Sequence, residues 1–237
     1  MWVALDRGLR LAEKHSNLPL PQRDVWRDSR DRLYEEVMEK GFNKDTQTFT
    51  QTYENDALDA SLLIMVLTFF INGNDPRFLS TLQAILRKKE KGGLTEAGLV
   101  FRYDTDKIDD GTGGGEEGGF SMCICWAIEA LTRAGEYEPA YLDQASIMLE
   151  DFLGFSNHLG LMSEEISKGG EQLGNTPQVS LLPGSFSQGA HYVTAVLLAL
   201  ENRASRTWLS SARATPWIAH SIKPARCTEP AALRTPK

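Results

Sequence analysis

The sequence predicts an all-α protein built from helical hairpins. Apolar residues recur at helical spacing along most of the 237-residue chain, and strongly apolar segments alternate with amphipathic ones. No convincing run of strand residues separates them. Paired helices of this kind stack into bundles, solenoids or closed toroids, with the more apolar helix of each pair in the inner layer.

Three helices are expected in the N-terminal third of the sequence. Trp2, Leu5 and Leu9 line one face of a first helix, which ends before the turn residues at 17–21. A second helix is expected over 22–39, because apolar residues keep helical spacing up to the natural stop at Gly41. Residues 56–71 are almost all apolar, which predicts an inner-layer helix.

Three more helices follow with the same alternation. Asp75 and Pro76 are typical of a helix start, and they predict a helix over 77–89. Residues 118–133 are again strongly apolar, and residues 139–155 are amphipathic. The segments therefore pair as inner and outer helices.

Two long polar loops separate these helices, at 101–119 and 156–178. Both place carboxylates next to glycines. Glycine lets the backbone approach a ligand closely, and carboxylates bind sugar hydroxyls or transfer protons. Long polar loops in a compact domain are usually functional, so we expect the active residues there.

Composition excludes several classes of function. The net charge of −7 leaves no basic footprint for nucleic acid or an anionic membrane. The apolar run at 60–72 is too short to span a bilayer, and charges at Asp6 and Arg7 interrupt any apolar leader. The three cysteines are expected to be buried free thiols in a reducing compartment, so we expect a cytoplasmic protein.

We expect neither a cofactor nor a metal ion. The glycines at 113–115 lack the lysine and hydroxyl of a phosphate-binding loop. The histidines have no paired spacing, and the aspartates at 104–110 lack the register of a calcium-binding loop.

Seven separated segments, in order along the chain, resemble glycoside hydrolase family 15, the glucoamylases and related trehalases. The resemblance covers about residues 1–178. The segments are WVALDRGLRLAE, YEEVMEKGFN, ALDASLLIM, DPRFLSTLQAI, GGLTEAGLVFRYD, DGTGGGEEGGFSMCICWAIEALTRAG and LGLMSEEISKGGEQLGNTPQ.

This resemblance implies an (α/α)6 toroid, of which residues 1–178 would form the C-terminal half, an incomplete ring of helical hairpins. It also implies inverting hydrolysis of α-glucosidic bonds, at the non-reducing ends of α-glucans or in trehalose. An inverting glycosidase uses one carboxylic acid and one carboxylate on opposite faces of the sugar, about 6.5–9.5 Å apart. The implied partner is a small α-glucoside, and nothing indicates an oligomeric state.

By position, the general base of the family corresponds to Glu164. The adjacent Glu165 is its nearest competitor, because spacing alone does not separate neighbouring glutamates. Arg102 and Asp104 match the segment that holds the terminal glucose, and a guanidinium fork suits paired hydroxyls. Glu116 and Glu117 match a family motif where they would bind substrate, or cap the following helix and complement its dipole.

The chain departs from the family pattern at both ends. In the family the general acid lies upstream of the segment that matches residues 2–13, so we expect no acid from this chain. Similarity ends after Gln178, and residues 179–237 are expected to form one divergent helix around 192–200 and a poorly ordered tail. The alternative to an active hydrolase is an inactive fragment or sugar-binding scaffold that lacks the general acid.

Overall fold

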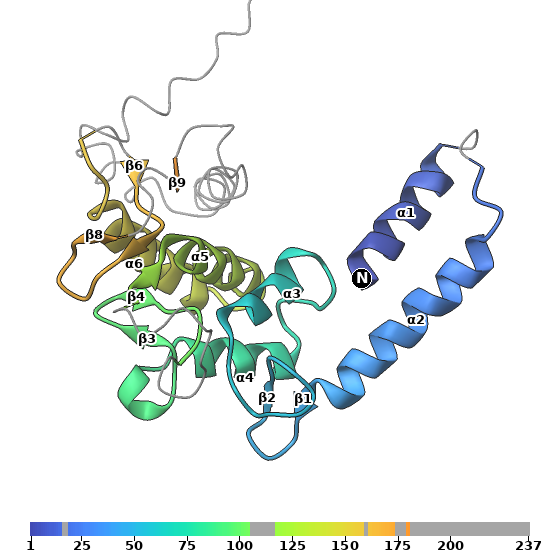
Figure 1. The fold of residues 1–237 in the computed structure, drawn as a ribbon, viewed down its shortest axis with the longest axis horizontal. Helices are drawn as coiled ribbons and strands as arrows, with labels where there is room; N and C mark the ends of the chain where they lie inside the picture. Colours follow the sequence, from blue (N-terminus) through green and yellow to red (C-terminus); the bar gives the residue numbers. More distant parts are fainter. Residues whose placement is uncertain (16–18, 105–116, 159–160, 174–178, 181–237) are drawn as a thin grey trace, which may run out of the picture. The chain divides into compact units, whose positions relative to one another are not determined.

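The computed structural model (Figure 1) describes residues 1–15, 19–104, 117–158, 161–173 and 179–180. The chain divides into two units, Met1–Leu197 and Leu198–Lys237, and every described residue belongs to the first. The helix expected at 192–200 and the expected tail beyond residue 180 lie outside the described residues, as does Glu116.

The first two predicted helices are confirmed as a hairpin. α1 spans Trp2–Lys14 and α2 spans Arg23–Lys40, and the two pack against each other. Gly8 permits this close packing, because a Cβ there would come 2.8 Å from the ring of Trp26. The buried carboxylate of Asp6 pairs with Arg10 at 2.8 Å, which neutralises the charge inside the hairpin.

The predicted inner helix over 56–71 is shorter than expected. A 3-10 turn, η1 (Ala60–Leu63), leads into a single α-helical turn, α3 (Ile64–Leu67). The start is late because Asp59 adopts an extended backbone and caps η1 by accepting the Ser61 N–H. The end is early because Phe69 adopts a left-handed backbone conformation, with a φ of 60°, through which a right-handed helix cannot continue.

Helix α4 (Pro76–Ile85) confirms the predicted start, since the Asp75 carboxylate accepts the Arg77 N–H at 2.9 Å. It ends four residues before the predicted end at residue 89. The Ile85 carbonyl accepts the Leu94 N–H at 2.9 Å, so the chain folds back instead of adding another helical turn. The returning segment contains a second 3-10 turn, η2 (Lys89–Lys91).

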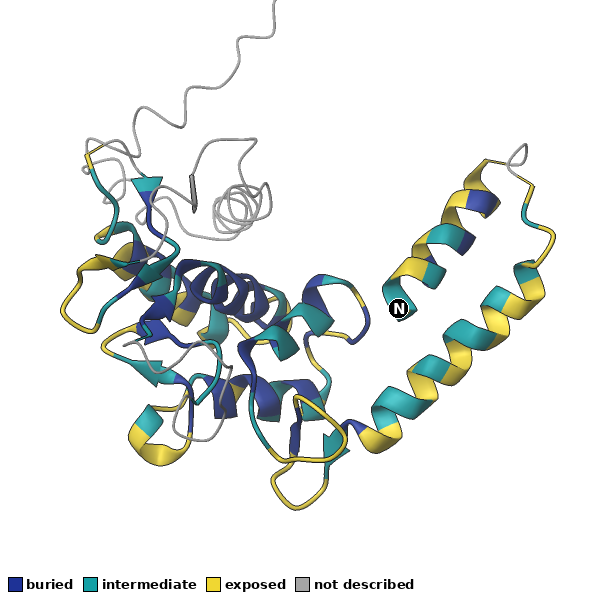
Figure 2. Ribbon diagram, viewed as in Figure 1, coloured by how far each residue is buried: buried dark blue, intermediate teal, exposed yellow. Residues whose placement is uncertain are grey.

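The last two helices show most clearly the predicted contrast between a buried inner helix and an amphipathic outer one. α5 (Ser121–Gly135) is buried on almost every side, whereas α6 (Ala140–Leu153) has one buried face (Figure 2). The two helices pack closely, and a Cβ on Gly135 would come 2.5 Å from Leu142. Each buried Leu or Ile in α5 stabilises the fold by about 1.5–3 kcal/mol. This pair supplies much of the core of the described chain.

Short antiparallel strands, not predicted from the sequence, close the loops. Each has two residues, too few for an alternating pattern to be recognised. β5 (Gly119–Phe120), β7 (Glu165–Ile166) and β8 (Gln172–Leu173) form one sheet. The remaining pairs are β1 (Phe42–Asn43) with β2 (Thr48–Phe49), β3 (Thr95–Glu96) with β4 (Leu99–Val100), and β6 (Leu161–Met162) with β9 (Val179–Ser180).

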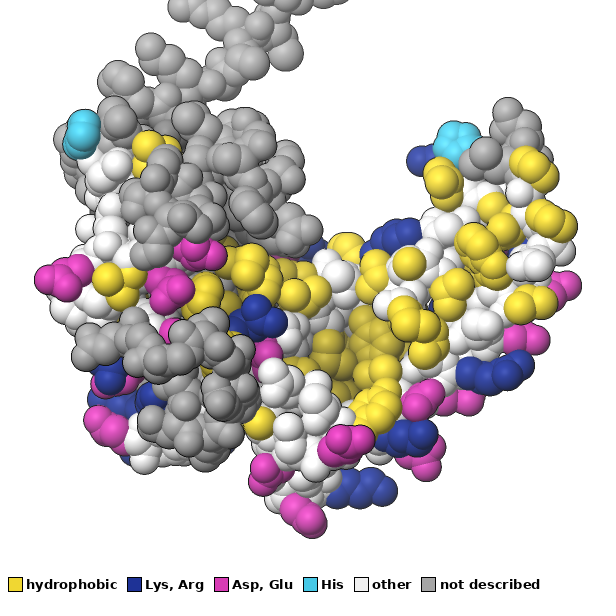
Figure 3. Space-filling model, viewed as in Figure 1, with side chains coloured by type: hydrophobic (Ala, Val, Ile, Leu, Met, Phe, Trp, Pro, Cys, Tyr) yellow, Lys and Arg dark blue, Asp and Glu magenta, His cyan; other side chains and the backbone are white. Residues whose placement is uncertain are grey.

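The described surface carries mixed charge. On the face shown in Figure 3, acidic and basic side chains are interspersed. No helix in the described part of the chain is long and apolar enough to cross a membrane.

Candidate active site

The two predicted loops meet at one small sheet. Strand β5 ends the first loop and pairs with β7 of the second, with Gly119 opposite Ile166 and Phe120 opposite Glu165. At the first residue of α5, the Ser121 N–H bonds to the Glu164 carbonyl at 3.0 Å. The loop that holds the proposed base is therefore fixed to the start of the most buried helix.

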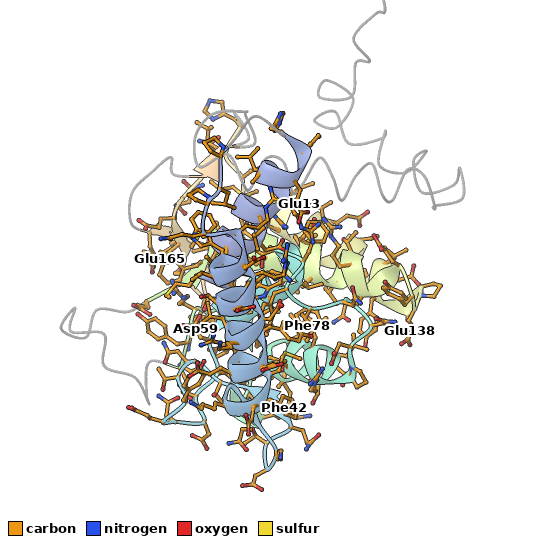
Figure 4. All side chains as sticks on the ribbon, turned by 90° about the vertical axis from the view of Figure 1, so that its right-hand side faces the viewer. Glu13, Phe42, Asp59, Phe78, Glu138 and Glu165 are labelled. Atoms are coloured by element: carbon orange, nitrogen blue, oxygen red, sulfur yellow. The ribbon has the colours of Figure 1, made fainter. Side chains whose placement is uncertain are left out.

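The adjacent glutamates have different surroundings. Glu165 accepts the backbone N–H of Gly118 at 2.9 Å through Oε2, so its side chain ties the two loops together. Glu164 is half-buried, and its own carbonyl holds the start of α5. Both candidate bases lie beside β5, and the side chain of Glu165 takes part in the β5–β7 connection. Figure 4 labels Glu165, which is half-buried, and Asp59, which is buried.

Arg102 forms an ion pair with Asp59. The Arg102 Nε lies 3.0 Å from Asp59 Oδ1, and the Ala60 N–H bonds to the Arg102 carbonyl at 2.8 Å. Asp59 is almost completely buried, whereas the Arg102 side chain is 35% exposed. One end of the arginine is anchored in the protein and the other reaches the surface.

Tyr103 connects this segment to the next carboxylate. Its hydroxyl donates to Glu117 Oε1 at 3.1 Å, and its backbone forms an isolated bridge with Asp59. Asp104 pairs with Lys89 at 3.7 Å. Glu117 therefore belongs to the connection between the two segments, whereas Asp104 interacts with η2.

A buried thiol lies under this region. Cys123 is fully buried in α5, and burial raises the pKa of its thiol far above the ordinary range. The positive charge of Arg102 lowers this pKa and the negative charge of Asp59 raises it, which places the sulfur within electrostatic reach of the ion pair. The thiol is therefore neutral at physiological pH.

Four of the predicted site residues lie on segments that are joined to one another, and Glu116 lies outside the described residues. Hydrogen bonds and short strands link the segments that carry Arg102, Glu117, Glu164 and Glu165. Asp104 is held by Lys89 instead. Within the described ranges, no three His, Cys, Asp or Glu side chains are grouped so as to hold a metal ion.

Sequence reasoning missed the residues that make the connections. Asp59 was not among the predicted site residues; it caps η1 and also pairs with Arg102. Tyr103 stands between two predicted residues, but its hydroxyl contact gives no sequence signal. Ser121 donates its hydroxyl to the Ser163 carbonyl at 2.8 Å, and a serine at a helix start is the one signal available.

Comparison with known proteins agrees with this architecture. The model of a family described as "Glycosyl hydrolases family 15" matches residues 1–179. The chain belongs to this family. Its all-α hairpins are accordingly part of the family's (α/α)6 toroid, as the resemblance implied.

Several relatives are named trehalases. The trehalases of Mycobacterium tuberculosis and Mycolicibacterium smegmatis are each 42% identical to this chain over 178 residues, and that of Thermoplasma volcanium is 40% identical. Each alignment covers 75% of this chain but only 24–26% of the relative. The chain thus spans about a quarter of the length of the curated relatives it matches. No solved structure matches the chain significantly.

Proposed function

We propose that this chain supplies the general base and a sugar-binding arginine for the inverting hydrolysis of trehalose. The observation that carries the proposal is the junction of the two loops, where the Ser121 N–H bonds to the Glu164 carbonyl at 3.0 Å and the Gly118 N–H bonds to Glu165 Oε2 at 2.9 Å. The names of the relatives support the substrate, since each of those proteins is called a trehalase.

In this mechanism Glu164 acts as the base. Its carboxylate takes a proton from a water molecule, and the water oxygen bonds to the anomeric carbon as the glycosidic C–O bond breaks. A second, protonated carboxyl group gives its proton to the leaving sugar oxygen. The family resemblance places that acid in a segment upstream of the one that matches Met1.

The fixed position of Glu165 supports Glu164 as the base. The backbone donor of Gly118 already uses one oxygen of Glu165, and moving this carboxylate would open the β5–β7 connection. A general base must accept a proton from the water molecule that attacks the anomeric carbon, and must later release that proton. The Ser121 N–H fixes the backbone of Glu164, and the family resemblance aligns the general base with this residue, so we assign the role to Glu164.

Arg102 is the proposed sugar ligand. Its Nε is held by Asp59 while its side chain remains 35% exposed, and a guanidinium fork can donate to two adjacent hydroxyls. Glu117, whose Oε1 accepts from Tyr103, borders the same group, and we propose Glu116 and Asp104 as further substrate contacts on the resemblance alone.

The thiols support a cytoplasmic location. Cys123 and Cys125 are both free and buried in α5. Unpaired thiols in a core are typical of proteins that fold in a reducing compartment. We therefore retain the cytoplasm as the proposed location.

The test is to titrate trehalose and maltose into the purified chain by NMR and to assay glucose release. We expect trehalose to bind more tightly than maltose, and Arg102→Gln to weaken that binding. Any turnover should disappear in Glu164→Gln and persist in Glu165→Gln. Binding without turnover would favour the sugar-binding scaffold, and the absence of binding to either sugar would contradict the proposal.

A further inference from the structure

We infer that Asp59 is a positioning residue that holds the Arg102 guanidinium ready for a sugar. The inference rests on the proposed function, in which Arg102 binds glucose. It assigns to a buried carboxylate outside both active loops a role in substrate affinity that acts through another side chain.

Three donors fix the Asp59 carboxylate. Oδ1 accepts the Ser61 N–H at 2.6 Å and Arg102 Nε at 3.0 Å, and Oδ2 accepts Gln51 Nε2 at 3.0 Å. The residue is only 2% exposed. A buried carboxylate is costly unless it is paired and hydrogen-bonded, so this arrangement holds the charge in one orientation.

The backbone reinforces the same alignment. Ala60 donates its N–H to the Arg102 carbonyl at 2.8 Å, and Asp59 forms an antiparallel bridge with Tyr103. The two partners are 43 residues apart in sequence, yet both backbone and side-chain contacts join them. The backbone of Arg102 and its Nε are therefore both fixed.

The geometry of guanidinium explains why this matters for a sugar. The guanidinium group is planar, so a carboxylate bound at its Nε also sets the direction of its two Nη groups. A free arginine side chain would lose its rotational freedom when it binds. Anchoring Nε in advance removes part of that cost and raises affinity through preorganisation.

The first variant is Asp59→Asn, which keeps an oxygen to cap η1 but removes the negative charge that orients Arg102. We expect trehalose affinity to fall by about tenfold to a hundredfold, the range associated with a misplaced binding group. The same substitution in an Arg102→Gln background should lower trehalose affinity almost no further, because the guanidinium that Asp59 orients is already absent.

Asp75→Asn is the matched control. Asp75 also caps a helix with Oδ1, which accepts both the Arg77 N–H at 2.9 Å and Arg77 Nε at 3.0 Å. The two variants therefore make the same chemical change at the start of a helix. Asp75→Asn should lower the thermal midpoint without changing trehalose affinity.

A second readout follows Arg102 without any sugar. A protected Nε–H signal of Arg102 should be visible by NMR in the wild type and in Asp75→Asn, and should broaden in Asp59→Asn. Persistence of that signal in Asp59→Asn would overturn the positioning of Arg102. Equal effects of Asp59→Asn on affinity with and without Arg102 would also overturn the inference.

The two readouts separate this inference from the proposed function. If the wild type shows the protected signal but binds no trehalose, the proposed function fails, and the sugar-related role of Asp59 fails with it. If the wild type binds trehalose and Asp59→Asn binds it equally well, only the inference fails.

Discussion

Glu165 accepts the backbone N–H of Gly118 at 2.9 Å, which joins the two acidic loops through one side chain. The preceding residue, Glu164, fixes the start of α5 through its carbonyl group. The two neighbouring glutamates thus both hold the junction of the loops, Glu165 with its side chain and Glu164 with its backbone carbonyl.

Glu165→Ala should lower the free energy of unfolding by about 1–3 kcal/mol, because it leaves the buried N–H of Gly118 without its acceptor. Glu165→Gln keeps an acceptor oxygen and should cost less. Urea unfolding followed by circular dichroism measures both. Equal stability of Glu165→Ala and the wild type would remove the structural role assigned to this side chain.

Gly118→Ala should separate β5 from β7. A Cβ at this position would lie 2.4 Å from the Ile166 carbonyl oxygen, and a backbone atom in a strand pair has little room to move. We expect loss of trehalose binding and a lower thermal midpoint. Gly169→Ala is the control, because its Cβ would meet only the Ser167 hydroxyl at an ordinary 3.6 Å. A tolerated Gly118→Ala would argue against close approach of the two loops.

Glu129 should make stability depend on pH. Burial in α5 raises the pKa of its carboxyl group, an effect that its ion pair with Arg133 partly offsets. The folded state then holds the proton more tightly than the unfolded state, so the stabilisation is complete below the ordinary pKa of 4.5 and is lost as pH rises through the folded pKa.

Glu129→Gln isolates this effect. The stability of the wild type relative to the variant should fall as pH increases from 4.5, where the ordinary pKa lies. Urea unfolding at several pH values measures the difference. A relative stability that instead rises over this window would show that Arg133 outweighs burial, and would reverse the sign of our pKa assignment.

The thiols of α5 should resist modification in the native protein. Burial raises the pKa of Cys125 to about 12, and that of Cys123 is raised as well. At pH 8 roughly one Cys125 thiol in ten thousand would be ionised, and the thiolate is the reactive form. In a Cys227→Ser variant, Ellman's reagent should label both thiols only after unfolding in urea. Rapid labelling without urea would mean that α5 is not the buried centre of the core.

Periodicity predicted the helices well where a helix has its own start and stop signals. The cap at Asp75 was visible because aspartate precedes a proline in the first turn, and α5 and α6 differ plainly in their apolar pattern. The helix over 56–71 was overestimated, since an apolar run does not reveal that Phe69 will adopt a left-handed backbone conformation.

The candidate site was predicted only in part, and the part that was missed has a physical explanation. The family resemblance located the two loops and their charged residues, but it did not reveal which side chains form structural contacts. Pairing of Asp59 with Arg102 depends on segments 43 residues apart, and the contact of Glu165 with Gly118 depends on a two-residue strand. Neither relationship leaves a periodic pattern in the sequence.

The most direct test of the central claim is hydrolysis of α-glucosyl fluoride, with the first-formed anomer of glucose identified by NMR. Fluoride leaves with little help from a general acid, so the rate reports the base itself. We predict that β-glucose appears first and that Glu164→Gln lowers the rate by about 10²–10⁴-fold, while Glu165→Gln has a much smaller effect. Initial release of α-glucose, or a rate unchanged by Glu164→Gln, would contradict the account.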